Sequence, residues 1–134
     1  MSTTPNLLIS HIAAAQNNKE VTANTGFDDF DGAITGLKTV AMANTDQTLS
    51  NADALYNMVF VCTGVDTADR NLILPQQKKL YIVSNQTTGG YNIIVKTAAG
   101  GSPTTVTLSN PNNSPLTSEY SILYCDGSNV ILIK

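Results

Sequence analysis

The chain has 134 residues, a formal net charge of −3 and 13 % charged residues, about half of the ~25 % that globular proteins carry. The length fits one compact domain with an appendage and argues against two full domains, while the few, dispersed Lys and Arg residues argue against a nucleic-acid partner, whose phosphates need clustered cations. Thr, Asn and Ser take the place of charges, and because such a surface repels copies of itself only weakly, the composition indicates assembly.

The first 37 residues differ from the rest and are predicted to form an N-terminal segment with one short helix. Residues 7–15 are an apolar patch that is too short for a stable isolated helix, so it must pack on something. The helix is predicted to begin after Thr25 as N-cap and to stop at Gly36. Its apolar stripe contains Phe27, Phe30, Ile34 and Leu37.

Residues 38–134 are predicted to form a β-domain. Short β-branched and aromatic runs alternate with Gly, Pro, Asn and Asp clusters, and the prolines fall between the runs, because proline cannot donate to a β-ladder. We expect a mainly β fold, an antiparallel sandwich or barrel of about seven or eight strands. No period of 20–50 residues repeats in the sequence, which argues against a solenoid. The expected strands lie near residues 38–43, 55–63, 70–74, 79–84, 91–97, 104–109, 119–125 and 129–133.

Two β-hairpins are predicted from turn chemistry. Thr88-Gly89-Gly90 separates the runs 80–87 and 91–97, and Asp126-Gly127 separates the last two runs of the chain. The runs 93–95 and 130–133 are apolar on both faces, so they need cover from the N-terminal segment or from a neighbouring subunit. This pattern is a second indication of an oligomer.

The sequence contains no clear site for catalysis, metal or cofactor. His11 is the only histidine and lies in an apolar patch, where we interpret it as a packed or interface residue. Cys62 and Cys125 lie inside apolar runs and are predicted to be free buried thiols, with a disulfide as the alternative. Without a CxxC motif or further histidines we expect no metal site, no cofactor and no enzyme.

Two further points concern solvation and location. The adjacent Lys78 and Lys79 are interpreted as solvated residues that protect a strand edge. No run reaches the ~20 apolar residues of a membrane helix, and the N-terminus lacks the features of a secretory signal, so we expect a protein made in the cytoplasm with no membrane partner. The tyrosines at 81, 91, 120 and 124 are expected to pack in the core and at strand edges, with a sugar-stacking platform as the alternative.

Two stretches resemble proteins of tailed bacteriophages. Residues 5–24, followed by Phe27-Asp28-Asp29-Phe30-Asp31, are similar to an N-terminal module of phage virion proteins with the pattern Ala-x-Gln-x-x-Lys-Glu-Val-x-x-Asn and then a short helix. The run Val-x-Asn-x-Thr-x-Gly-Gly at 83–90 and the closing Tyr-Cys-Asp-Gly-x-Asn-Val at 124–130 resemble small β-modules at the ends of phage fibre and decoration proteins. Together the two stretches cover about half of the chain.

The resemblance implies a non-enzymatic virion structural protein. We expect a homotrimeric capsid decoration, or cement, protein that docks on the major capsid protein or another virion protein through its N-terminal segment and stabilises the particle. The segment 1–37 would then anchor the protein, and the β-domain would project. The expected docking residues are Leu7, Leu8, Ile9, Ile12, Gln16, Lys19, Glu20, Val21 and Asn24.

Two alternatives remain open. The first is a short head-fibre, tail-fibre or baseplate adhesin that binds a host surface glycan, although the chain has no room for a long shaft. Its expected loop contacts are Asn85, Thr88, Tyr91, Asn112 and Asn113. The second alternative is an enzyme with a site scattered over the sequence, for which Asp28, Asp31 and Asp126 are the residues to test.

Overall fold

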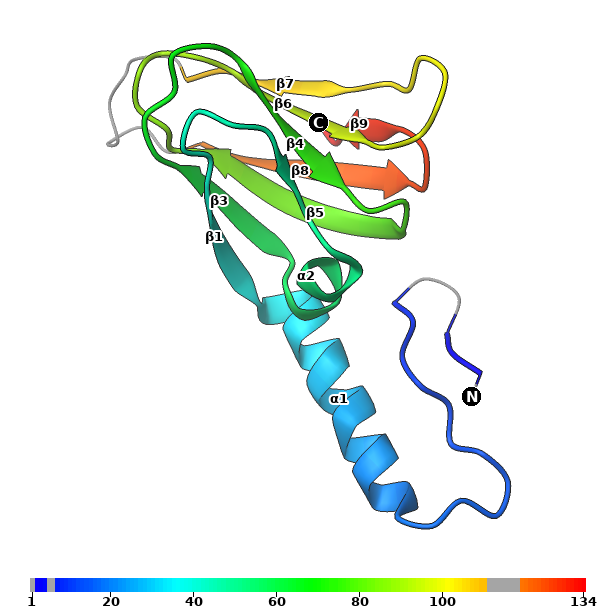
Figure 1. Cartoon of the computed structure of the whole chain (residues 1–134). Coiled ribbons are helices and arrows are strands. Elements are labelled where there is room, and N and C mark those ends of the chain that lie inside the picture. The colour runs from blue at the N-terminus through cyan, green and yellow to red at the C-terminus, as the bar shows by residue number, and fades with distance from the viewer. Residues whose placement is uncertain (1, 5–6, 111–118) are drawn as a thin grey trace.

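The computed structural model describes residues 2–4, 7–110 and 119–134, which form a β-domain with a long helix that projects from one end (Figure 1). The described part of the chain consists mainly of strands, as predicted. Its elements are α1 (Lys19–Thr35), β1 (Leu37–Ala41), β2 (Gln47–Thr48), α2 (Asn51–Tyr56), β3 (Val59–Thr63), β4 (Arg70–Leu74), β5 (Lys78–Asn85), β6 (Ile93–Thr97), β7 (Val106–Leu108), β8 (Tyr120–Asp126) and β9 (Val130–Leu132).

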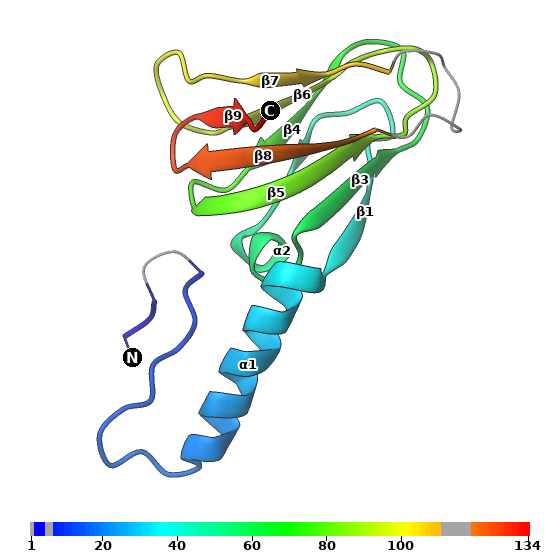
Figure 2. The same ribbon diagram turned by 180° about the vertical axis from the view of Figure 1, so that it is seen from behind.

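The strands form two sheets that face each other across the core (Figures 1 and 2). The first sheet has the order β1-β3-β5-β8-β9, and the second has the order β2-β4-β6-β7. Successive strands alternate between the two sheets, so the pairs β1–β2, β3–β4 and β5–β6 form three turns stacked on one another. Within each sheet, the neighbouring strands of these turns run parallel. Strands β7, β8 and β9 then extend the two sheets by antiparallel pairing.

The prediction of an antiparallel sandwich or barrel is therefore wrong in strand direction, and the two sheets do not close into a barrel. Gly89 and Gly90 have positive φ angles, as expected for a turn. This turn, however, carries the chain from β5 into the other sheet, so the predicted hairpin between 80 and 97 does not form. Turn residues specify where the chain changes direction, but they do not specify which strand receives it.

The stacked turns are evenly spaced only in the second sheet. Strands β2, β4 and β6 begin at Gln47, Arg70 and Ile93, so each begins 23 residues after the one before. Strands β1, β3 and β5 of the first sheet begin at Leu37, Val59 and Lys78 and do not keep this spacing. The even spacing of the second sheet is not accompanied by a repeated sequence motif.

Aspartates tie neighbouring turns of the second sheet together. Asp46, directly before β2, accepts hydrogen bonds from the backbone N–H of Asn71 at 2.9 Å and from its side-chain amide at 2.7 Å. Asp69, directly before β4, accepts the same pair from Asn92 at 2.9 and 3.2 Å. The bonds from Asn71 lower the pKa of Asp46. Each carboxylate therefore fixes the start of one strand against the next.

The core lies between the two sheets. Phe60 of β3 and Tyr81 of β5 are its largest fully buried side chains, and their ring centroids lie 6.0 Å apart. Cys62 and Cys125 are buried free thiols, as predicted. Burial raises the pKa of Cys62 to about 12, so this thiol stays protonated at neutral pH.

The last hairpin forms as predicted between β8 and β9. The Asp126 carboxylate accepts hydrogen bonds from the backbone N–H of Ser128 at 2.9 Å and of Asn129 at 2.7 Å, and from the Asn129 amide at 3.0 Å. Gly127 occupies the left-handed region with φ 102°. The hydrogen bonds from Asn129 are the main cause that lowers the pKa of Asp126 to about 2.

Both helices differ from the prediction. Helix α1 begins at Lys19, directly after Asn18 with φ 54°, and not after Thr25. Helix α2 was not predicted, and the strand expected at 55–63 begins only at Val59. Ser50 and Asp53 form a capping box at the start of α2, and this motif is readable in the sequence.

Gly36 joins α1 to the β-domain. Its carbonyl accepts the backbone N–H of Met58 at 2.8 Å and of Val59 at 3.0 Å, at the start of β3. A Cβ atom on Gly36 would lie 1.9 Å from the carbonyl oxygen of Tyr56, a distance at which two backbone segments must move apart. Glycine is therefore required here for close approach, and not for its backbone angles.

We expect Gly36→Ala to lower the free energy of unfolding by about 1–3 kcal/mol, the usual cost of overpacking. Urea unfolding followed by circular dichroism measures this change. Gly100→Ala is the matched control, since nothing lies within 4 Å of the added Cβ. The control should change stability by less than about 1 kcal/mol. Equal stability of the two variants would contradict the close contact at Gly36.

We expect the stabilisation of the protein by the Asp126 carboxylate to be complete above about pH 4 and to be lost progressively as the pH falls further. Its folded-state pKa of about 2 lies below the ordinary value of 3.8, so the unfolded chain binds the proton first as the pH falls. The stabilisation is therefore complete above pH 3.8 and is lost between 3.8 and about 2. Urea unfolding from pH 2 to 6 should show the difference between the protein and Asp126→Ala shrinking over this window. A difference that is constant with pH would refute this role of the carboxylate.

Candidate functional site

The N-terminal strap, defined as the described residues 2–4 and 7–18, folds back along α1 (Figure 1, dark blue). Thr3 and Ser10 pair as an antiparallel bridge, and the N–H of Thr4 donates to the carbonyl of Ile9 at 2.9 Å. Ile9 is buried, with its Cγ2 atom 3.4 Å from the position of a Cβ on Gly26 of α1. Ile9 thus holds the strap against the helix and leaves almost no surface for a partner, so we remove it from the docking set.

Other residues of the strap are exposed. Leu8 is 43 % and Ile12 is 48 % exposed, while Leu7 is half-buried. Leu8 and Ile12 are therefore the predicted docking residues of the strap that offer the most apolar surface to another molecule.

Gln16 has a structural partner in the turn before α1. Its side-chain oxygen accepts the N–H of Ala13 at 2.8 Å, and its amide nitrogen donates to the hydroxyl of Thr22. These bonds fix the turn from the strap into the helix. The other predicted docking residues lie exposed in the first half of α1: Lys19, Glu20, Val21 and Asn24.

The predicted loop contacts do not form one surface. Asn85 is buried, not exposed: its amide donates to the carbonyls of Tyr91 at 3.1 Å and Leu108 at 3.0 Å, and its oxygen accepts the N–H and hydroxyl of Thr87. It anchors the turn between the sheets from inside. Thr88 and Tyr91 are exposed on that turn. Asn112 and Asn113 lie outside the described residues.

The four tyrosines do not share one exposed face, so the predicted sugar-stacking platform is not formed by all of them. Tyr81 is fully buried in the core. Tyr120 and Tyr124 alternate with buried residues of β8 and lie on the outer face of the first sheet, whereas Tyr91 lies on the turn before β6.

The ionisable side chains that sequence analysis singled out have local structural partners. His11 is exposed, not packed as predicted, and its Nδ1 atom lies 3.0 Å from the hydroxyl of Ser2 in the strap. Lys79 is buried, not solvated: its ammonium donates to the carbonyls of Ala54 and Asn57 at the end of α2, and burial lowers its pKa to about 8. No group of three or more His, Cys, Asp and Glu side chains within the described residues could hold a metal ion.

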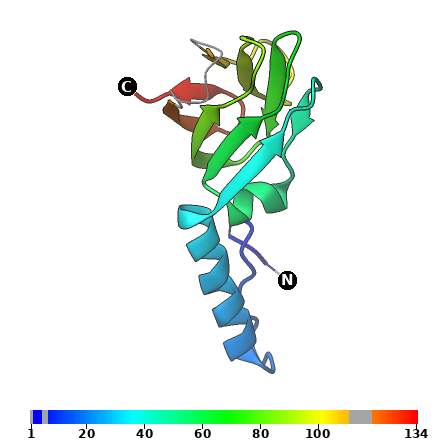
Figure 3. The same ribbon diagram turned by 90° about the vertical axis from the view of Figure 1, so that its left-hand side faces the viewer.

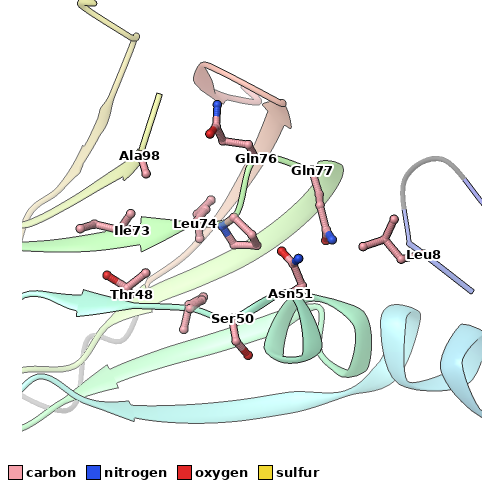
Figure 4. A pocket seen from close by; sticks show the side chains of 11 residues that line it. Leu8, Thr48, Ser50, Asn51, Ile73, Leu74, Gln76, Gln77 and Ala98 are labelled. Carbon is pink, nitrogen blue, oxygen red and sulfur yellow. The ribbon is translucent and has the colours of Figure 1, made fainter. Parts of the chain in front are cut away.

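A cleft of about 580 Å³ lies where the second sheet, α2 and the strap meet (Figure 4). Thr48, Ser50, Asn51 and Gln76 contribute hydroxyl and amide groups, and the described lining residues include no ionisable side chain. Gln77 is 9 % exposed, and its buried amide oxygen has no hydrogen-bond partner in the described part of the chain. The cleft therefore offers neutral polar groups beside apolar side chains, while the unpaired Gln77 oxygen lies below its surface.

The largest exposed feature is apolar. Phe27 is 70 %, Phe30 48 % and Ile34 65 % exposed on α1. At the base of the helix, Phe30 and Ile34 line an apolar hollow of about 390 Å³ together with Leu80 at the start of β5. The sequence showed this stripe, but it did not show that the stripe would remain uncovered within the chain.

No helix within the described residues is long and apolar enough to cross a membrane. Comparisons of the chain with protein-family models, with curated proteins and with solved structures gave no match.

Proposed function

We propose that this chain is a non-enzymatic structural protein of a bacteriophage virion, a homotrimeric capsid decoration protein that docks through its N-terminal strap. The observation that carries the proposal is the stalk formed by α1, whose 17 residues extend about 25 Å from the end of the β-domain. The strap runs back along the stalk from its far end, so that Leu8 lies beside the β-domain and lines the cleft next to α2 (Figures 1, 2 and 4). The attribution to a virion depends on the resemblance of residues 5–24.

The surface chemistry supports a role in attachment. The cleft of about 580 Å³ has no ionisable group among its described lining residues, and a catalytic site would need an acid, a base or a nucleophile there. The stalk instead exposes three large apolar side chains, Phe27, Phe30 and Ile34, and residues of this kind contribute most when they become buried against another protein.

Leu8→Asp is expected to leave the fold intact and to weaken attachment to the particle by about 30-fold or more, because it places a charge in an apolar contact. The measurement is co-sedimentation with particles of the encoding phage that were assembled without this protein. Val65→Asp is the matched control, since Val65 is an exposed apolar residue of the β-domain away from the strap. If both variants bind like the unchanged protein, the strap is not the docking element.

The cleft supports a second candidate, a fibre-like adhesin that binds a host glycan. A sugar presents many hydroxyl groups, some apolar C–H surface and no charge, which matches an uncharged lining of hydroxyl, amide and apolar side chains. In Figure 4 the side chains of Gln77 and Asn51 extend toward the same opening.

For this candidate we expect host surface polysaccharide to bind saturably, and Gln77→Met to weaken binding at least tenfold while the size of the side chain is kept. Isothermal titration calorimetry measures both. Gln76→Met is the control for a more exposed amide in the same lining. Absence of saturable binding by the unchanged protein would rule the adhesin out, whatever the particle experiment shows.

A further inference from the structure

The apolar residues of α1 follow the spacing of a coiled-coil seam. Ala23, Phe27, Phe30 and Ile34 are separated by steps of four, three and four residues, which is the alternation of d and a positions in a heptad repeat. We call these four residues the seam, and Leu37 follows them at the start of β1. A seam of this period is buried by another helix of the same period, and the other helix of the described chain, α2, has only six residues.

The strap leaves most of the seam uncovered. It packs on the neighbouring face of α1, where Gly26 meets Ile9, and reaches the seam only at its base, where Leu7 lines the hollow with Phe30 and Ile34. Phe27 and Ile34 remain the most exposed large side chains of the helix, at 70 % and 65 %. The chain therefore has its own cover for one face of α1 and none for most of the seam.

The seam continues into the outer face of the first sheet. Within β5 and β8, residues alternate between the core and the outside, and the outward positions include Leu80, Ile82 and Ile122. Ile82 pairs with both Val59 and Ile122, so one apolar row crosses the sheet. Figure 3 shows the sheet and α1 from this side, with the strap behind the helix.

Few charges lie on this outer face. Among the outward positions of the described strands β1, β3, β5, β8 and β9, only Lys78 and Asp126 are charged, and they lie opposite each other at the end of the sheet where Lys78 lines the hollow with Phe30 and Ile34. Their opposite charges offset each other, so the face presents little net charge to a copy of itself.

The exposed area matches that of a stable interface. The large side chains of the seam and the outer face are between 44 % and 70 % exposed. At about 150–250 Å² for each aromatic and somewhat less for each aliphatic side chain, they expose on the order of 800 Å² of apolar surface. This exceeds the largest patch of a typical monomer, about 300–600 Å², and equals the contribution of one partner to a standard interface. The side chains are Phe27, Phe30, Ile34, Leu37, Leu80, Tyr120, Ile122, Ile131 and Ile133.

We propose that α1 packs in parallel against the α1 helices of other copies of this chain, through the seam, and that the outer face of the first sheet extends the contact. The orientation is parallel because the sheet follows the C-terminal end of α1, so only parallel helices bring the sheets of the copies together. The inference deepens the proposed function and rests on it for the homo-oligomer. Segment 1–37, which is expected from the sequence to anchor the protein, is thereby divided: α1 serves self-association, and the strap serves docking.

Phe27→Asp is expected to convert the protein to single chains of 14.2 kDa, whereas Val21→Asp leaves the mass of the oligomer unchanged. Val21 is the matched control, since it is 59 % exposed on the same helix but outside the seam. Light scattering of the full chain measures the mass, and circular dichroism checks that α1 persists. A single-chain mass of the unchanged protein, or an unchanged mass of Phe27→Asp, overturns the seam.

Ile34→Cys tests the parallel orientation of the α1 helices. In parallel helices residue 34 lies at the same height in each copy, so the new thiols of two copies come together. We expect an oxidised dimer on a non-reducing gel, and none with Val21→Cys. The native thiols Cys62 and Cys125 are buried and should not react. Absence of the Ile34 cross-link in a protein that does assemble overturns the parallel seam.

The two proposals can fail separately. A mass of two chains supports the seam and refutes the homotrimer of the proposed function. Loss of particle attachment by Leu8→Asp at unchanged mass supports docking through the strap, whatever the seam variants do.

Discussion

The close approach of two backbone segments at Gly36 is the constraint on which the rest of the molecule depends. The carbonyl of Gly36 accepts two N–H groups from the start of β3, and the Tyr56 carbonyl lies where a side chain would otherwise be. Gly32, one turn earlier, also lies close to Tyr56, which would be 3.0 Å from an added Cβ. Because these contacts join backbone to backbone, they fix the direction of α1 relative to the first sheet. The apolar stripe of the helix and the outer face of the sheet are thereby held as one continuous surface.

Helix α1 is poorly stabilised by its own sequence. Glycine at positions 26 and 32 costs about 1 kcal/mol each relative to alanine, and an isolated helix of this length is marginal in water. The strap contributes one buried apolar side chain, Ile9, on one face. Phe27 and Ile34 contribute nothing while they face water, and their burial would add roughly 1.5–3 kcal/mol each before the loss of side-chain freedom. Self-association and stability of the stalk are therefore coupled, because the same side chains serve both.

Local features of the fold could be predicted from the sequence, whereas its connectivity could not. The strand at 70–74 and the hairpin at Asp126 follow from β-branched runs and turn residues, which act over a few positions. Parallel stacking depends on which sheet receives the strand after Gly90, and residues at the turn do not determine this. Because asparagine is common in turns, the sequence predicts a surface position for Asn85. The side chain is instead buried, and its four hydrogen bonds hold the turn between β5 and β6 from the inside. The capping box at Ser50 was a readable signal that was missed.

Separate surfaces for docking and for self-association have an energetic consequence. If each copy docks through a small exposed patch such as Leu8 and Ile12, a single strap binds weakly, because it buries little area. Copies joined through α1 present several straps at the same end of the assembly, and each strap after the first binds at a high effective concentration. In the proposed assembly, attachment would then depend on the seam even though the seam would touch no particle. Weak single contacts combined with strong assembly would let a small, sparsely charged chain bind a repeating lattice selectively over single copies of its subunits.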